Sequence, residues 1–462
     1  MYRDFIKIKT MFFIKNAFKK IFNTENKINI AKNSGWLILD HGIKIIFGIL
    51  VGAWVARYLG PDDYGKFNYA LALLALFSPF SDLGLLATVP KELINREAHQ
   101  ENIIGSAFFL KFFGGILILI LSVLVCFWTY PNDIIYLFLT FFIGLSFLFK
   151  SFDVLSIWFL NKLQSKYTVI ARTSGLMVSA LFKIFFIISG FSLVYFSIAL
   201  TIESFIISLI LIFLFIKTEP FFNYKKIKLN FKESFNLIKI SWVFILSAFL
   251  NMIMLNIDKI MIEKMLGSYE LGLYSVIAFF SYYFIILANC IFQSTYPILI
   301  KLDKNNSFEH YTKDFQKLLN YLAISAYFII IIIFFNYDFI VQFLWGSQYK
   351  NSGYLLSIQI FSILPFFIGL STTGLIIVKN YIKLYVITIF TGTIINALLN
   401  YFLIKRFGAA GASYATIITF FWCNNIIYLF SDKTRHLFKM QLKALFLADY
   451  IKLIVLKILK LP

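Results

Sequence analysis

Nine charged side chains lie inside stretches of sequence that are otherwise apolar, and their types indicate which chemistry the protein could perform. The basic residues are Lys44, Lys150, Lys183 and Lys259, and the acidic ones are Asp40, Asp82, Asp153, Glu203 and Asp258. A charged group at the centre of a lipid bilayer costs on the order of 3 kcal/mol on insertion scales, so these groups are expected to face a hydrated interior. Four lysines around one cavity predict a binding site for an anion. The acids predict ion pairs or a site for a coupling ion.

Several of these charges have neighbours of opposite sign. Asp40 and Lys44 are four residues apart and Lys150 and Asp153 are three apart, so each pair can meet on one helix face. Asp258 is followed directly by a lysine, and adjacent helical residues point about 100° apart, so these two do not simply neutralise each other. The spacing therefore leaves two roles open for each charge, which are substrate binding and a structural ion pair.

Twelve long apolar segments must position these residues. Of the 462 residues, 60% are hydrophobic and only 14% are charged, with a mean hydropathy of +0.81, which is too apolar for an ordinary soluble domain. Segments of about 20 or more apolar residues span a bilayer as helices. They are 33–58, 65–89, 105–128, 133–158, 167–189, 192–216, 240–265, 272–299, 318–344, 352–378, 381–404 and 409–431. The sequence predicts an all-α protein that crosses the membrane about twelve times.

A repeat divides these segments into two halves. The matching residues, offset by 207, are Leu59 and Leu266, Gly60 and Gly267, Gly65 and Gly272, and Phe77 and Phe284. Because six crossings bring the chain back to its starting side, the second half enters the membrane in the same sense as the first. We therefore expect two parallel six-helix lobes around a central cavity, formed by residues 33–216 and 240–431.

The remaining segments are basic, and the linker among them is hydrophilic. They are an N-terminal segment at 1–32, a linker at 217–239 and an amphipathic tail at 432–462, with a thirteenth span as the alternative for the tail. Alternate loops on one side hold 33 lysines and arginines, counting Lys111 and Arg172, and the loops on the other side hold six. Cytoplasmic loops are enriched in these residues, so both termini and the linker are predicted to be cytoplasmic. The net charge of +20 then indicates topology and contact with anionic lipids, and no nucleic-acid partner is expected.

No pattern typical of an enzyme or a metal site accompanies these spans. The sequence lacks GxSxG, HExxH and Walker motifs, and Cys126, Cys290 and Cys423 each lie in an apolar run without a nearby CxxC or histidine. We expect a transporter without catalytic residues, cofactor or metal.

Four stretches of the sequence together resemble the bacterial polysaccharide flippases. These are Wzx-type O-antigen transporters of the multidrug/oligosaccharidyl-lipid/polysaccharide superfamily. The four stretches are Ala56–Leu85, Trp158–Arg172, Asn256–Ser275 and Arg406–Thr419. The resemblance implies a MATE-like protein of the inner membrane. It would move undecaprenyl-diphosphate-linked oligosaccharide repeat units to the periplasmic leaflet, in contact with a polysaccharide polymerase and chain-length proteins. The family tends to carry arginine where this chain has Lys259, which keeps the charge but not bidentate phosphate binding.

Two other functions fit part of the sequence. A multidrug exporter of the same superfamily, coupled to protons or sodium, would be expected to have a cation pocket dominated by carboxylates. A membrane polymerase or glycosyltransferase acting on the same lipid would need a large outer loop or an acidic cytoplasmic motif, and neither is present. The sequence does not identify the sugars or the coupling ion.

Overall fold

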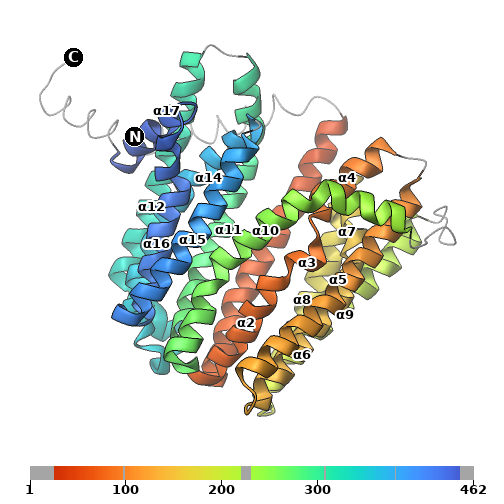
Figure 1. Ribbon diagram of the computed structural model, residues 1–462, viewed down its shortest axis with the longest axis vertical. Coiled ribbons are helices and arrows are strands. Elements are labelled where there is room, and N and C mark those ends of the chain that lie inside the picture. The colour runs from red at the N-terminus through yellow and green to blue at the C-terminus, as the bar shows by residue number, and fades with distance from the viewer. Residues whose placement is uncertain (1–24, 97–98, 220–229, 306–307, 380, 448–462) are drawn as a thin grey trace, which may run out of the picture.

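The computed structural model describes residues 25–447 apart from 97–98, 220–229, 306–307 and 380, and every regular element in this part of the chain is a helix (Figure 1). The predicted N-terminal segment and the end of the predicted tail therefore lie largely outside the described residues. We name the helices up to residue 218 the first bundle and those from residue 231 onward the second bundle.

The first bundle begins with the longest helix of the chain. Its helices are α2 (Glu25–Phe77), α3 (Pro79–Asp82), α4 (Leu85–Asn95), α5 (Gln100–Thr129), α6 (Ile134–Phe149), the 3₁₀ turn η2 (Lys150–Phe152), α7 (Asp153–Asn161), α8 (Ser165–Ile188) and α9 (Leu193–Thr218).

The second bundle ends in a short amphipathic helix. Its helices are α10 (Phe231–Leu266), α11 (Ser268–Asn305), α12 (Phe308–Trp345), η4 (Ser347–Tyr349), α13 (Ser352–Gln359), η5 (Ile360–Ser362), α14 (Ile363–Val378), α15 (Ile382–Phe407), α16 (Ala409–Asn424), η6 (Ile426–Phe430) and α17 (Arg435–Leu445).

Eleven described segments are long and apolar enough to cross a membrane, and the first of them contains two crossings. That segment runs from Gly35 to Asn95 and is 61 residues long, about twice the length that a bilayer requires. Gly60 divides it, because its φ of 73° and ψ of 171° are not helical. Gly267 has nearly the same conformation, with φ 92° and ψ 172°. Only glycine adopts such angles readily, which explains why both halves of the repeat carry glycine at this corner.

Two further spans are interrupted inside the bundles. The fourth crossing changes from α6 to α7 through η2, and the tenth changes from α13 to α14 through η5. The helix of the second crossing stops at Phe77, because Pro79 cannot continue the preceding hydrogen-bond pattern. The short helix α3 and a turn at Gly84 separate it from α4. Lys150 is the first residue of the 3₁₀ turn η2 and Asp153 is the first residue of α7, so the two do not lie on one regular α-helix.

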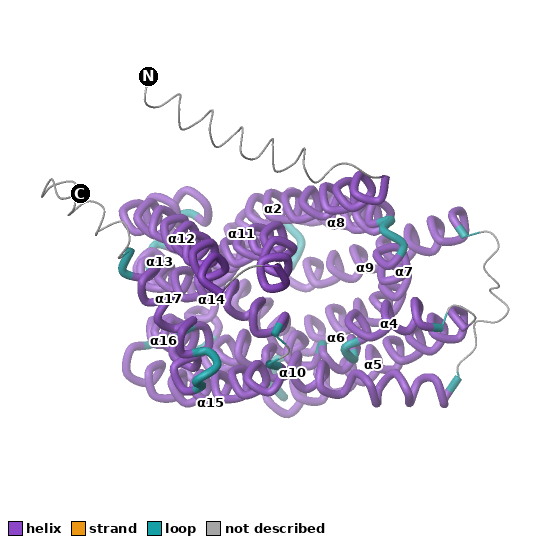
Figure 2. Tube along the Cα trace, turned by 90° about the horizontal axis from the view of Figure 1, so that it is seen from above, coloured by secondary structure: helices purple, strands orange, loops and turns teal. Residues whose placement is uncertain are grey.

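The two bundles meet at the end of the molecule that contains Gly60 and Gly267, which we name the Gly60 end. Figure 1 shows the helices converging at this lower end and spreading toward the upper end. Across the interface α2 packs most extensively on α11. The largest apolar core cluster spans both bundles there, since it joins Ala56 and Tyr64 to Tyr274. In the view along the helices, α2 and α8 lie on one side of the first bundle and α5 and α6 lie on the other (Figure 2).

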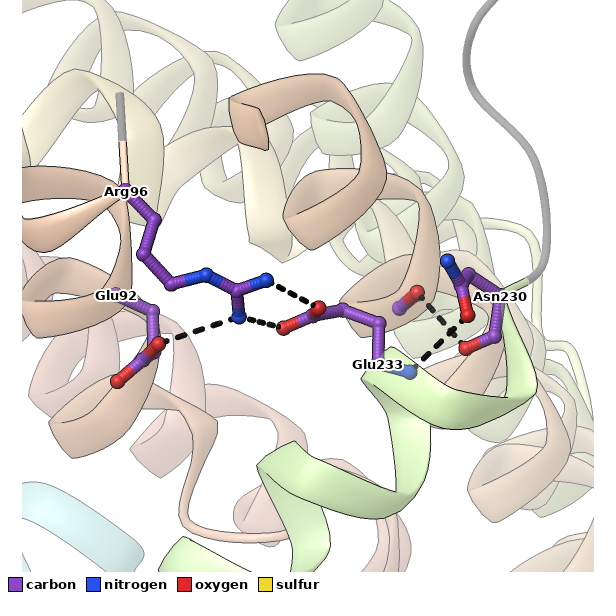
Figure 3. A network of polar contacts seen from close by, with 5 residues as sticks. Glu92, Arg96, Asn230 and Glu233 are labelled. Atoms are coloured by element: carbon purple, nitrogen blue, oxygen red, sulfur yellow. Dashed lines mark hydrogen bonds and ion pairs between the residues drawn. The ribbon is translucent and has the colours of Figure 1, made fainter. Parts of the chain in front are cut away.

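Helix α10 connects the bundles at the opposite end. Its first turns lie against the first bundle, where the Arg96 guanidinium donates two hydrogen bonds to the Glu233 carboxylate at 2.6 and 2.8 Å (Figure 3). These hydrogen bonds raise the pKa of Arg96. Asn230 caps the helix by accepting a hydrogen bond from the backbone N–H of Glu233 at 3.2 Å. The segment predicted as a linker over 217–239 is therefore helical from Phe231 onward.

Helix α17 packs on the second bundle. Leu437, Gln441 and Ala444 are buried, and the Tyr327 hydroxyl donates a hydrogen bond to the carbonyl of Leu445 at 2.6 Å. The prediction of a helix in the tail thus holds for residues 435–445, with its buried face against protein. The alternative of a thirteenth span falls mainly on residues outside the described part.

Candidate functional site: a charged cavity in the first bundle

Four spans of the first bundle enclose a cavity of about 160 Å³. Its walls are formed by Lys44, Phe149, Lys150, Asp153, Arg172, Glu203, Ser204 and Ile207. These residues come from α2, α6 with η2 and α7, α8, and α9, so sequence positions more than 160 residues apart meet in one place. Four of the nine charged residues singled out in the sequence line this cavity, and we name it the charged cavity.

Asp40 anchors the wall formed by α2. Its carboxylate is 2% exposed and accepts a hydrogen bond from the Lys44 ammonium at 2.8 Å, so the predicted ion pair is present. The Arg172 guanidinium lies 4.0 Å from the same carboxylate oxygen. The other carboxylate oxygen, Oδ1, has no hydrogen-bond partner. The Asp40 carboxylate therefore lies close to two cations of the cavity wall, Lys44 and Arg172, and both cations keep N–H groups that can bind a ligand.

Lys150 is exposed at the cavity wall although it lies in the middle of a span. Its ammonium lies 4.1 Å from the centroid of the Phe147 ring. Within the described residues it forms no ion pair with Asp153, although both residues line the cavity. Lys150 and Arg172 thus present cationic groups to the cavity without a direct hydrogen bond to a carboxylate in the described part of the chain.

Like Asp40, two other predicted site residues of the first bundle do not line the cavity. Lys183 lies on α8, eleven residues after the cavity residue Arg172. Asp82 forms an ion pair with Lys111 at 2.7 Å, with the aspartate exposed and the lysine buried. The sequence count assigned Lys111 to a cytoplasmic loop, and this was wrong, because Lys111 lies on α5 twelve residues into the helix.

The charged pair in the second bundle makes hydrogen bonds to other residues of that bundle. Asp258 is buried and accepts a hydrogen bond from the Tyr274 hydroxyl at 2.5 Å. The Lys259 ammonium donates to the side-chain oxygen of Asn256 at 3.2 Å. Neither residue lines the charged cavity. A role for Lys183 or Lys259 in substrate binding stays a prediction.

Arg172 is the cavity residue that the sequence interpretation missed. It was counted as a loop residue because it lies near the start of a span, yet α8 begins seven residues earlier at Ser165. The signal that could have identified it is an arginine inside the apolar segment 167–189, which also contains Lys183. A guanidinium can bind a phosphate group through two parallel hydrogen bonds, which an ammonium cannot do.

The Gly60 end closes the space between the bundles. A Cβ atom on Gly65 would lie 1.8 Å from the carbonyl oxygen of Ser268, and a Cβ on Gly272 would lie 1.8 Å from that of Pro61. These two contacts are related by the repeat, because both glycines and both carbonyl residues are offset by 207.

Hydrogen bonds also join the two bundles at the Gly60 end. The Tyr349 hydroxyl donates to the carbonyl of Ala56 at 2.9 Å, and the Tyr136 hydroxyl donates to Glu263. Glu263 is a second residue that the sequence interpretation missed. It lies at the last turn of α10 and is buried against the first bundle.

Comparison with known proteins identifies the family. Residues 30–303, more than half of the chain, match the family described as polysaccharide biosynthesis protein. The chain belongs to this family. The prediction of a membrane transporter of the polysaccharide type, and not an enzyme, is thereby confirmed.

Two curated relatives carry related names. A capsular polysaccharide biosynthesis protein from Staphylococcus aureus, CapF, is 24% identical over 407 residues, covering 85% of this chain and 96% of the relative. A protein from Shigella flexneri named as an O-antigen transporter is 33% identical over 102 residues, covering 21% of this chain and 24% of the relative.

Solved structures confirm the predicted fold class. An inward-facing multidrug transporter of the MATE family and MOP superfamily is similar with a TM-score of 0.71 at 12% identity, covering 86% of this chain and 96% of the other. The lipid II flippase MurJ is similar with a TM-score of 0.60 at 14% identity, covering 92% of each chain. The protein is therefore an all-helical, multi-pass membrane protein with a MATE-like fold.

Proposed function

We propose that this protein is a flippase that moves undecaprenyl-diphosphate-linked oligosaccharide repeat units across the bacterial inner membrane by alternating access. The observation that carries the proposal is the charged cavity, where Lys44, Lys150 and Arg172 surround one space inside a bundle of membrane spans. A diphosphate is the anion of the proposed substrate, and charge-assisted hydrogen bonds from these groups are about twice as strong as neutral ones.

Membership of the polysaccharide biosynthesis family supports this substrate class. A relative named as a capsular polysaccharide biosynthesis protein and another named as an O-antigen transporter are consistent with it. The acids Asp153 and Glu203 in the cavity wall, and Asp40 behind it, are proposed as ion-pair partners or as sites for a coupling proton or sodium ion. Anionic lipids and the polymerase and chain-length proteins remain proposed partners.

A multidrug exporter is the second candidate, and one observation favours it. The fold resembles that of a multidrug transporter of the MATE family with a TM-score of 0.71. However, three basic and two acidic side chains line the charged cavity, whereas a site for cationic drugs is expected to be dominated by acids. We therefore favour the lipid-linked substrate.

Deleting the gene in its native host tests the proposal in cells. We expect surface polysaccharide to disappear while undecaprenyl-diphosphate-linked repeat units accumulate, because synthesis continues on the cytoplasmic side. Lipid extraction followed by mass spectrometry measures this pool, and a plasmid copy of the gene is the control. Normal surface polysaccharide in the deletion strain, combined with new sensitivity to cationic drugs, would instead support the exporter.

We also propose that both termini face the cytoplasm, as the distribution of lysine and arginine indicates. The Gly60 end would then face the periplasm, and the structure would be closed on the periplasmic side. Reporter fusions at Asp432 and at Asn132 are expected to report cytoplasmic and periplasmic locations, respectively. The reverse pattern would mean that the closed Gly60 end faces the cytoplasm, which contradicts the proposed orientation.

A further inference from the structure

A second cavity, larger than the charged one, lies inside the second bundle. Its volume is about 370 Å³, and it is enclosed by α10, α11, α14, α15, α16 and η6. None of its sixteen described lining residues carries a charge. The walls combine aliphatic side chains and aromatic rings with a smaller number of amide and hydroxyl groups. Asn251, Tyr385 and Asn424 are the polar residues on which the following steps rest. We name this space the neutral cavity.

The neutral cavity occupies the place in the second bundle that the charged cavity occupies in the first. The charged cavity is formed by the first, fourth, fifth and sixth crossings, and the neutral cavity is formed by the seventh, tenth, eleventh and twelfth, with α11 in addition. Lys44 lines the charged cavity, and Asn251, which lies 207 residues later and is its equivalent in the repeat, lines the neutral cavity. The duplicated fold thus holds two equivalent cavities in which an ammonium and an amide take the same position.

Several polar groups in the neutral cavity are available to a ligand. Within the described residues, the side chains of Asn251, Asn424 and Tyr385 make no hydrogen bond to another protein group. Asn424 is fixed in place all the same. Its backbone carbonyl accepts a hydrogen bond from the Gln441 amide at 2.8 Å, and a Cβ on Gly369 would lie 2.1 Å from its own Cβ. Packing and the backbone hydrogen bond therefore fix the position of Asn424, and its side-chain amide remains available to bind a ligand.

We infer that the neutral cavity binds the sugar rings of the transported molecule, while the charged cavity binds its diphosphate. This inference rests on the proposed function and adds a second subsite to it. Amide groups both donate and accept hydrogen bonds, as sugar hydroxyls do, so they match a ligand that is rich in hydroxyls and carries no charge. Aromatic walls such as Tyr385 and Phe420 pack against the apolar faces of such rings.

The size and the lack of charge agree with this assignment. Cavities of roughly 300 to 1,000 Å³ accommodate small organic ligands, and 370 Å³ falls in this range. A diphosphate would lose its hydration in the neutral cavity without meeting a cation, which is costly. The two cavities therefore differ in the chemistry that they accept.

Purified protein in lipid nanodiscs allows the two subsites to be tested separately. The probes are the repeat-unit oligosaccharide released from the host's own lipid-linked pool by mild acid, and inorganic diphosphate. We expect Asn251→Leu and Tyr385→Phe to weaken oligosaccharide binding by about tenfold, because each leaves sugar hydroxyls without a partner. Affinity for diphosphate is expected to stay unchanged in both variants. Arg172→Ala is expected to show the opposite pattern.

Asn336→Leu, which alters an exposed asparagine on α12, is the matched control and should bind both probes normally. The inference is overturned if the wild-type protein does not bind the free oligosaccharide, if Asn251→Leu and Tyr385→Phe bind it normally, or if they lose both probes equally. The proposed function can survive each of these results, provided that the wild-type protein moves lipid-linked oligosaccharide across a membrane. If the wild-type protein fails to do so, the proposed function is wrong instead.

Discussion

Replacing Arg172 by alanine is expected to reduce export of polysaccharide by about 10- to 100-fold while the protein remains inserted at its normal level. A hydrogen bond to a charged group contributes about 1.5 to 3 kcal/mol, and each 1.4 kcal/mol corresponds to about a tenfold change. Arg172 lies on the cavity wall 4.0 Å from Asp40, and Asp40 retains Lys44 as a partner at 2.8 Å. The substitution therefore removes a cation from the cavity without leaving a buried carboxylate alone.

Matched variants separate charge from geometry. Arg172→Lys should give an intermediate rate, because it keeps the charge and loses the two-pronged hydrogen bonding. Lys150→Ala should also lower export, whereas Lys317→Ala should not, since Lys317 lies on the surface in an exposed pair with Asp314. Rates are measured as labelled surface polysaccharide per amount of membrane-inserted protein. Normal export by both Arg172→Ala and Lys150→Ala would show that the charged cavity does not bind the substrate.

Adding a single methyl group at Gly272 is expected to disrupt the closed Gly60 end. The new Cβ would lie 1.8 Å from the carbonyl oxygen of Pro61, and backbone atoms cannot move aside as a flexible side chain can. Overpacking of this kind costs about 1 to 3 kcal/mol, which is enough to change the ratio of closed to open molecules by about 5- to 150-fold. Gly65→Ala should act in the same way, since its Cβ would lie 1.8 Å from the carbonyl oxygen of Ser268.

Labelling of a cysteine at the interface measures this opening. In a chain whose native cysteines are replaced, Ala56→Cys places a thiol at a site that is 0% exposed in the closed structure. A membrane-impermeant maleimide should label it about fivefold faster or more when Gly272→Ala is present. Gly42→Ala, on the same helix as Ala56 with no atom within 4 Å of the new Cβ, should leave the labelling rate unchanged. Equal labelling in all three proteins would mean that the Gly60 corner does not hold the bundles together.

The fold could be predicted from the sequence because each feature has a local cause. Span lengths follow from apolar runs, and the repeat at Gly60 and Gly267 follows from a backbone conformation that only glycine adopts readily. Parallel halves follow from the even number of crossings. The Asp40 and Lys44 pair was also predictable, since it depends only on the spacing of four residues along one helix.

The composition of the site was less predictable because it depends on how helices pack. The convergence of Lys259 with Lys44 on one cavity between the lobes stays a prediction, and the structure shows the Lys259 ammonium donating to Asn256. Arg172 was counted with a loop, but it lines the charged cavity. The reason is that α8 begins at Ser165 and therefore includes Arg172. The neutral cavity had no signal in the sequence, since its polar residues are uncharged and are spread over several spans.

Transport by the purified protein in liposomes tests the central claim most directly. Undecaprenyl-diphosphate-linked repeat units are incorporated on both leaflets, and a membrane-impermeant periodate reagent oxidises the sugars that face outward. With wild-type protein, the account predicts that nearly all repeat units become accessible with time, whereas in protein-free liposomes and with Arg172→Ala about half stay protected over the same interval. If the protected half persists with the wild-type protein while a cationic dye is transported, the flippase assignment is contradicted.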